Sequence, residues 1–262
     1  MSPDIIDLLN VKADGYNRPS FIAKDPVSIP HRFQLQQDIE IMGFWAAILA
    51  WGQRPVILKK AAELIDLMDG APYDFVLNHD EHDLARFAAF KHRTFNFTDT
   101  AYFLSFFQTY YRQHNSLEDA FLPPDGATND TTVRRHLEHF HDQFCSLPHF
   151  TPRTRKHIAT PARNSSCKRL LMFLRWMVRR DHNGVDFGLW TRIRPDQLVI
   201  PIDVHVGRVA NLLGLLPQRS TATHSPDWNT AVALTETLRQ LDPTDPVRYD
   251  FALFGLGVEG EM

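Results

Sequence analysis

Apolar residues recur along this chain mainly three and four positions apart, which is helical spacing, while the alternation typical of strands is scarce. Proline and glycine divide the sequence into segments of helix length. The pattern therefore predicts an all-α fold. The expected helices cover residues 4–10, 34–51, 55–69, 80–88, 98–113, 131–146, 166–181, 204–215, 227–241 and 246–256.

The length and composition of the chain favour a buried core. With 262 residues, 44% of them hydrophobic, the chain is long enough for one large domain or two interlocked small ones. The first twenty residues lack the apolar run of a signal peptide, and no later segment approaches the length of a membrane span. We therefore expect a soluble cytoplasmic protein without a membrane partner.

Cysteine is rare in the chain. Cys145 and Cys167 are too few for a disulfide framework, a four-cysteine iron–sulfur cluster or a structural zinc ribbon. We expect two free thiols and no cofactor.

Charge is unevenly distributed. The formal net charge is −3, yet residues 153–180 contain nine basic residues and no acidic one. Local positive charge of this kind favours phosphate binding, because bound counterions are released. A solvated helix face is the alternative interpretation of the same run. The candidate contacts to a DNA backbone are Arg153, Arg155, Lys156, Arg163 and Arg169.

Lys168 lies where a short loop leads into a very apolar helix. The loop, Thr160–Cys167, precedes the apolar run Leu170–Leu174, so Lys168 falls in the first helical turn. The helix dipole and the adjacent Arg169 both disfavour an ammonium ion there, which favours Lys168 as an amine nucleophile. The alternative is that Lys168 contacts a DNA phosphate or solvent.

Asp203 follows an extended apolar stretch, Val199–Ile202, and precedes an amphipathic helix. This is the N-cap position, and a plain helix cap is one interpretation. The rigid Pro201 and the apolar neighbours favour a second one, in which the carboxylate stays charged near helix amides and is aimed into a cleft.

A lysine that opens a helix, followed by Pro201-Ile202-Asp203-Val204-His205, resembles the helix-hairpin-helix DNA glycosylase superfamily. The segment Phe44–Gln53 is similar to the endonuclease III helix that ends in a DNA-probing glutamine, and Gln53 falls on that glutamine. The matches run in the same order from about residue 40 to residue 255.

The resemblance implies two helical subdomains with the active site in the cleft between them. Residues 31–182 would carry the DNA-probing loop and a modified hairpin, and residues 1–30 plus 183–262 would carry the catalytic aspartate. The protein would work as a monomer, without a metal, on double-stranded DNA that contains a damaged base.

The resemblance also implies roles for single residues. Lys168 would attack the sugar, release the base and form a Schiff base, with Asp203 assisting, which makes a glycosylase with AP lyase activity. Extrusion of a stacked base needs a wedge and a pocket. Gln53 and Arg54 would fill the gap in the duplex. The remaining base-pocket candidates are Trp51, Asp250 and Phe254, the last two with core packing and a helix-start charge as the alternative.

Two departures from the superfamily concern the hairpin and the spacing. The sequence has Ala162-Arg163-Asn164-Ser165-Ser166 where the family usually has Gly-x-Gly, and the distance from lysine to aspartate is longer than in endonuclease III. Both features resemble the archaeal 8-oxoguanine glycosylase branch and a bacterial family of unassigned activity related to it. An oxidised purine such as 8-oxoguanine is the substrate that this implies.

Two other functions compete with this interpretation. A non-catalytic helical DNA-binding protein would use the same basic residues, with Lys168 as one more phosphate contact. A metal-dependent hydrolase would use histidine and aspartate ligands. The candidate ligand clusters are His79, Asp80, His82 and Asp83, and His136, His139 and His141.

Overall fold

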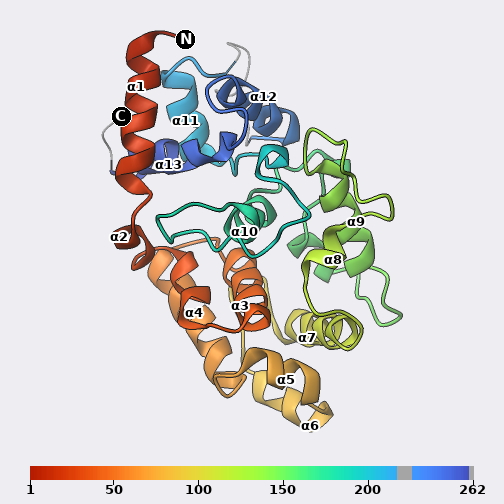
Figure 1. The fold of residues 1–262 in the computed structure, drawn as a ribbon. Helices are drawn as coiled ribbons and strands as arrows, with labels where there is room; N and C mark the ends of the chain where they lie inside the picture. The colour runs from red at the N-terminus through yellow and green to blue at the C-terminus, as the bar shows by residue number, and fades with distance from the viewer. Residues whose placement is uncertain (217–225, 260–262) are drawn as a thin grey trace. The chain divides into compact units, whose positions relative to one another are not determined.

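The computed structural model of the protein describes residues 1–216 and 226–259. Every regular element within these residues is a helix, and strand pairing is limited there to two isolated bridges, His92 with Phe95 and Ser165 with Asp227 (Figure 1). The expected all-α fold is confirmed. No helix in the described ranges combines the length and the apolar character that a membrane crossing needs.

The chain folds into two compact units. The terminal unit comprises Met1–Ala23, Thr128–Arg135 and Thr160–Met262, and the central unit comprises Lys24–Ala127 and His136–Ala159. These boundaries differ from those expected from the sequence, since residues 160–182 belong to the unit that carries Asp203. The reason is that Arg175, in this segment, forms buried ion pairs with Asp186 and Asp250 of the terminal unit.

The terminal unit is built around the contact of its first and last helices. Gly255 permits this contact, because a Cβ at this position would overlap the Tyr16 ring. α11 packs against the same helix, α13. The α-helices of the unit are α1 (Pro3–Tyr16), α2 (Pro19–Ile22), α10 (Lys168–Val178), α11 (Val204–Leu212), α12 (Trp228–Arg239) and α13 (Asp250–Glu259), and its 3-10 helices are η5 (Pro161–Arg163), η6 (Pro195–Gln197) and η7 (Pro246–Tyr249).

The central unit surrounds one almost wholly buried helix, α3. Its residues from Ile39 to Ile48 are all buried, and Phe44 and Trp45 pack against Phe103 in an aromatic core. The α-helices of the unit are α3 (Gln36–Ile48), α4 (Arg54–Leu67), α5 (Pro72–Asn78), α6 (Glu81–Leu84), α7 (Phe97–Tyr111), α8 (Glu118–Phe121) and most of α9 (Arg134–Phe144), and its 3-10 helices are η1 (Pro26–Ser28), η2 (Pro30–Arg32), η3 (Ala85–Phe87) and η4 (Thr154–His157).

The observed helices follow the expected ones closely, with differences at their ends. The helix expected over 4–10 runs from Pro3 to Tyr16, and that expected over 80–88 is divided into α6 and η3. The helix α5 was not expected. Pro72 at its first position is a helix-start signal, but seven residues are too few to produce a clear apolar period.

Candidate functional site

Lys168 and Asp203 form an ion pair in the terminal unit. The Lys168 Nζ lies 2.6 Å from Asp203 Oδ2, although the two residues are 35 positions apart in the sequence. Lys168 is the first residue of α10, and Asp203 is the N-cap of α11. The side chains are 34% and 19% exposed, so a solute can reach the pair.

The carboxylate of Asp203 is held at both oxygens. Its second oxygen, Oδ1, accepts the Val206 N–H at 2.9 Å, which is the N-cap bond expected from the sequence. Burial would raise the pKa of Asp203, but the Lys168 ammonium and the Val206 N–H outweigh burial and hold the pKa below its usual value. The preceding stretch is buried, and Ile200 N–H donates to the Thr235 hydroxyl at 3.0 Å. Asp203 is therefore an ionised acceptor on a rigid support.

The loop before Lys168 makes tight turns without glycine. Asn164 and Cys167 adopt left-handed backbone conformations, with φ of 55° and 52°. Asn164 Nδ2 donates to Asp227 Oδ2 at 2.9 Å, and Cys167 N–H donates to the Ser165 hydroxyl at 3.2 Å. These side-chain hydrogen bonds stabilise left-handed turns that glycine usually forms.

Asp250 lies in the interior near this pair. Its side chain is 8% exposed, and Arg175 donates a short hydrogen bond to its Oδ2. Burial raises the pKa of Asp250 to about 6; Arg175 opposes the increase, and the negative charge of Asp203 adds to it. Because the carboxylate is engaged by Arg175, the packing interpretation explains Asp250 better than contact with a base does.

Phe254 packs against another aromatic ring of the terminal unit. Its ring centroid lies 6.1 Å from that of Phe21 in an edge-on arrangement, and the side chain is half-buried. This contact fits core packing, the alternative that the sequence left open.

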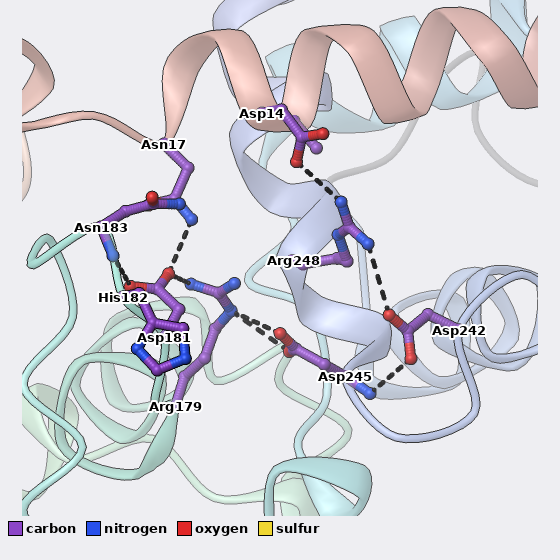
Figure 2. A pocket seen from close by; sticks show the side chains of 10 residues that line it. Asp14, Asn17, Arg179, Asp181, His182, Asn183, Asp242, Asp245 and Arg248 are labelled. Carbon is purple, nitrogen blue, oxygen red and sulfur yellow. Dashed lines mark hydrogen bonds and ion pairs between the residues drawn. The ribbon is translucent and has the colours of Figure 1, made fainter.

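The terminal unit also has a polar cavity of about 250 Å³ beside α1 (Figure 2). Arg179 contacts Asp181 and Asp245 there, while Arg248 contacts Asp14 and Asp242. Figure 2 shows that these ion pairs join residues from α1, η7 and the segment after α10. The aspartates of the cavity neutralise both arginines, and the resulting ion pairs connect α1, η7 and the segment after α10.

The expected DNA-probing residues lie at the start of α4 and in the segment that precedes it in the central unit. Gln53 is the N-cap of α4 and is exposed, Arg54 is the first residue of that helix, and Gly52 has φ of 111°. Trp51 is half-buried. The Arg93 guanidinium lies over its ring, 5.1 Å from the centroid. Sequence reasoning missed Arg93, because a single basic residue in a loop produces no periodic signal.

The basic run is not one charged surface. Arg153 and Lys156 belong to the central unit, and Arg153 is engaged by Asp99 and by Asn96 Oδ1 at 2.7 Å. Arg175 and Arg179 are buried in ion pairs with aspartates of the terminal unit. A uniform phosphate-binding run over residues 153–180 is therefore not what the folded chain presents.

The remaining candidate cations differ in their surroundings. Arg155 lies over the Phe150 ring, 5.2 Å from its centroid. Lys156 and Arg163 are exposed, whereas burial lowers the pKa of Arg169. Lys156 and Arg163 are thus the better placed of these four for contact with a polyanion.

The histidine clusters are not arranged as metal sites. His79 Nδ1 contacts the Phe75 carbonyl at 3.0 Å, and Asp80 accepts the N–H groups of His82 and Asp83 as a helix cap. His136 is wholly buried in α9. In the described part of the chain, no group of three or more potential ligands could hold a metal ion.

Comparison with known families finds a match over most of the chain. The model of a family described as "Protein of unknown function (DUF2400)" matches residues 25–259. No curated protein and no solved structure matches the chain. Since the family match covers most of the sequence, the chain belongs to the DUF2400 family.

Proposed function

We propose that the protein is a DNA glycosylase with associated AP lyase activity, which removes a damaged base from double-stranded DNA. The observation that supports this most directly is the Lys168–Asp203 pair, with 2.6 Å between Nζ and Oδ2 and both side chains partly exposed. An amine beside an ionised carboxylate has the two groups that covalent base excision requires.

In the proposed reaction, the bond between the damaged base and the anomeric carbon breaks first, and the base leaves with the bonding electrons and takes up a proton. Lys168 Nζ then passes a proton to Asp203, and the free amine forms a bond to the anomeric carbon of the sugar. The resulting nitrogen–carbon bond becomes a Schiff base as the sugar ring opens, and loss of the 2′ proton expels the 3′ phosphate.

The position of Asp203 supports its second role in this reaction. Positive charge develops on the sugar as the base leaves, and a carboxylate that remains ionised stabilises it. The pKa of Asp203 lies below its usual value, which keeps the group charged at neutral pH. Val206 N–H fixes the orientation of the carboxylate without neutralising it.

The direct test is borohydride trapping of the Schiff base. Wild-type protein should crosslink to a duplex that contains its lesion, and Lys168→Gln should not. Lys24→Gln is a matched control, because Lys24 is an exposed lysine of the central unit. Failure of the wild type to crosslink to any lesion, or undiminished crosslinking by Lys168→Gln, would refute the lysine assignment.

The substrate that we propose is an oxidised purine such as 8-oxoguanine, on the resemblance to the archaeal glycosylase branch. A panel of duplexes with 8-oxoguanine, uracil, an abasic site or no lesion tests it. A non-catalytic DNA-binding protein would crosslink to none of them and would bind damaged and intact duplexes equally. Gln53 and Arg54, at the exposed start of α4, are proposed to fill the space of the extruded base.

A further inference from the structure

Residues 92–95 of the central unit form a tight turn with a strained residue at its tip. His92 and Phe95 exchange both backbone hydrogen bonds, each 2.9 Å long. Arg93 has φ of 55°, a left-handed conformation that is unfavourable for a residue with a long side chain. Strain of this kind persists only where the surroundings impose it, and it is common at functional sites.

The turn is attached to the segment that joins α3 to α4. His92 is 3% exposed, and its Nε2–H donates to the Trp51 carbonyl at 3.1 Å. The Arg93 guanidinium covers the Trp51 ring at 5.1 Å and lies so close to Gly52 that a Cβ there would be 2.8 Å from Nη1. Both neighbours therefore restrict where the guanidinium can lie.

The charge of Arg93 is not neutralised by the protein. Arg93 is exposed, and no carboxylate pairs with it among the residues that the structure describes. Two other arginines of the same unit differ, since Arg153 contacts Asp99, and Arg86 contacts both Asp69 and Asp83. Arg93 is thus an uncompensated planar cation against Gly52, the residue that precedes the exposed Gln53.

We propose that Arg93 binds a phosphodiester of the DNA backbone next to the nucleotide that Gln53 contacts. A guanidinium offers two parallel N–H groups to two phosphate oxygens. Stacking on Trp51 orients the plane before binding, which reduces the entropy lost on contact. The proposal rests on the proposed function for the identity of its ligand, double-stranded DNA.

The test is the salt dependence of duplex binding by the full chain. Each phosphate contact to B-DNA contributes about 0.9 to the slope of log affinity against log salt. Between about 50 and 200 mM salt, the affinity of Arg93→Ala should therefore fall about 3.5-fold less than that of the wild type. At about 50 mM salt, Arg93→Ala should bind roughly tenfold more weakly.

The control variants separate a phosphate contact from a structural role. Arg86→Ala changes the net charge equally and should leave the slope at the wild-type value, because Arg86 is already paired with carboxylates. Arg93→Lys retains the charge and should restore the slope to the wild-type value. Its affinity should lie between that of the wild type and that of Arg93→Ala. A slope for Arg93→Ala equal to that of Arg86→Ala, or no duplex binding by the wild type, overturns the proposal.

The two proposals fail in different ways. Wild-type trapping together with an unchanged slope in Arg93→Ala would remove Arg93 from the DNA contacts and leave the glycosylase assignment intact. A smaller slope of log affinity against log salt in Arg93→Ala, without any borohydride trapping by the wild type, would support the phosphate contact and refute the enzymatic activity.

Discussion

Replacement of Asp203 by asparagine separates the two contacts of its carboxylate. Oδ2 pairs with the Lys168 ammonium, and Oδ1 accepts the Val206 N–H. An asparagine oxygen can still cap α11, but the side chain carries no charge. Alanine removes both contacts, so the pair of variants distinguishes the helix cap from the ion pair.

The expected losses of stability follow from the geometry. Loss of an N-cap costs about 1 kcal/mol. The ion pair is 34% and 19% exposed, so solvent screens part of it, and its removal should cost about 1 kcal/mol. At neutral pH, Asp203→Asn should therefore reduce the free energy of unfolding by about 1 kcal/mol, and Asp203→Ala by about 2 kcal/mol.

The pH dependence of this loss has a definite sign. The pKa of Asp203 is lower in the folded than in the unfolded protein. The carboxylate thus contributes stability above its unfolded pKa, and this contribution is lost as pH falls through the lowered folded pKa. The difference between wild type and Asp203→Asn should therefore shrink below about pH 4.

Urea unfolding measures these losses, and single-turnover base release on a lesion duplex measures the chemistry. If the proposed reaction holds, Asp203→Asn should slow base release at least about 100-fold, because the group proposed to stabilise the charge on the sugar and to accept the lysine proton is absent, while duplex binding stays close to wild type. Equal destabilisation by asparagine and alanine would contradict the separate roles of the two oxygens. Base release by Asp203→Asn at the wild-type rate would refute the catalytic role.

Two further predictions concern buried carboxylates. The pKa of Asp250 is raised to about 6, so the folded protein holds a proton that the unfolded chain releases, and stability should fall by about 3 kcal/mol as pH rises from about 4 to 6. Asp250→Asn should abolish this decrease in urea titrations, and a decrease that persists would contradict the assignment. Asp99 is wholly buried beside Arg153, Thr154 and His157, so Asp99→Ala should reduce the free energy of unfolding at neutral pH by about 3–5 kcal/mol. Burial would raise the pKa of Asp99, but hydrogen bonds from His157, the Asn96 N–H and Thr154 lower it to about 2, so the wild-type advantage should be complete above about pH 4 and about 2 kcal/mol smaller at about pH 2. A loss below about 1 kcal/mol at neutral pH would show that Arg153, Thr154 and His157 form hydrogen bonds with water when the carboxylate is absent.

Local interactions allow much of the helical framework to be predicted from the sequence alone. Apolar residues three and four apart mark the buried face of a helix, as Leu137, Phe140 and Phe144 do in α9. Caps depend on neighbouring residues as well, and Asp203 lies at the N-cap of α11 as expected. Lys168 is the first residue of α10, as expected, because the apolar run of this helix begins two residues later at Leu170.

The ion pairs, the domain boundary and the geometry of the site depend on long-range contacts. The spacing of residues along the sequence does not indicate which carboxylate an arginine will contact. The sequence shows Arg175 and Arg179 as part of a basic run, whereas the folded chain buries both against aspartates up to 75 positions away. Those ion pairs also assign α10 to the terminal unit and so change the domain boundary. The 2.6 Å between Lys168 and Asp203, and the exposed position of Arg93 over Trp51, likewise depend on segments that meet only in the tertiary structure.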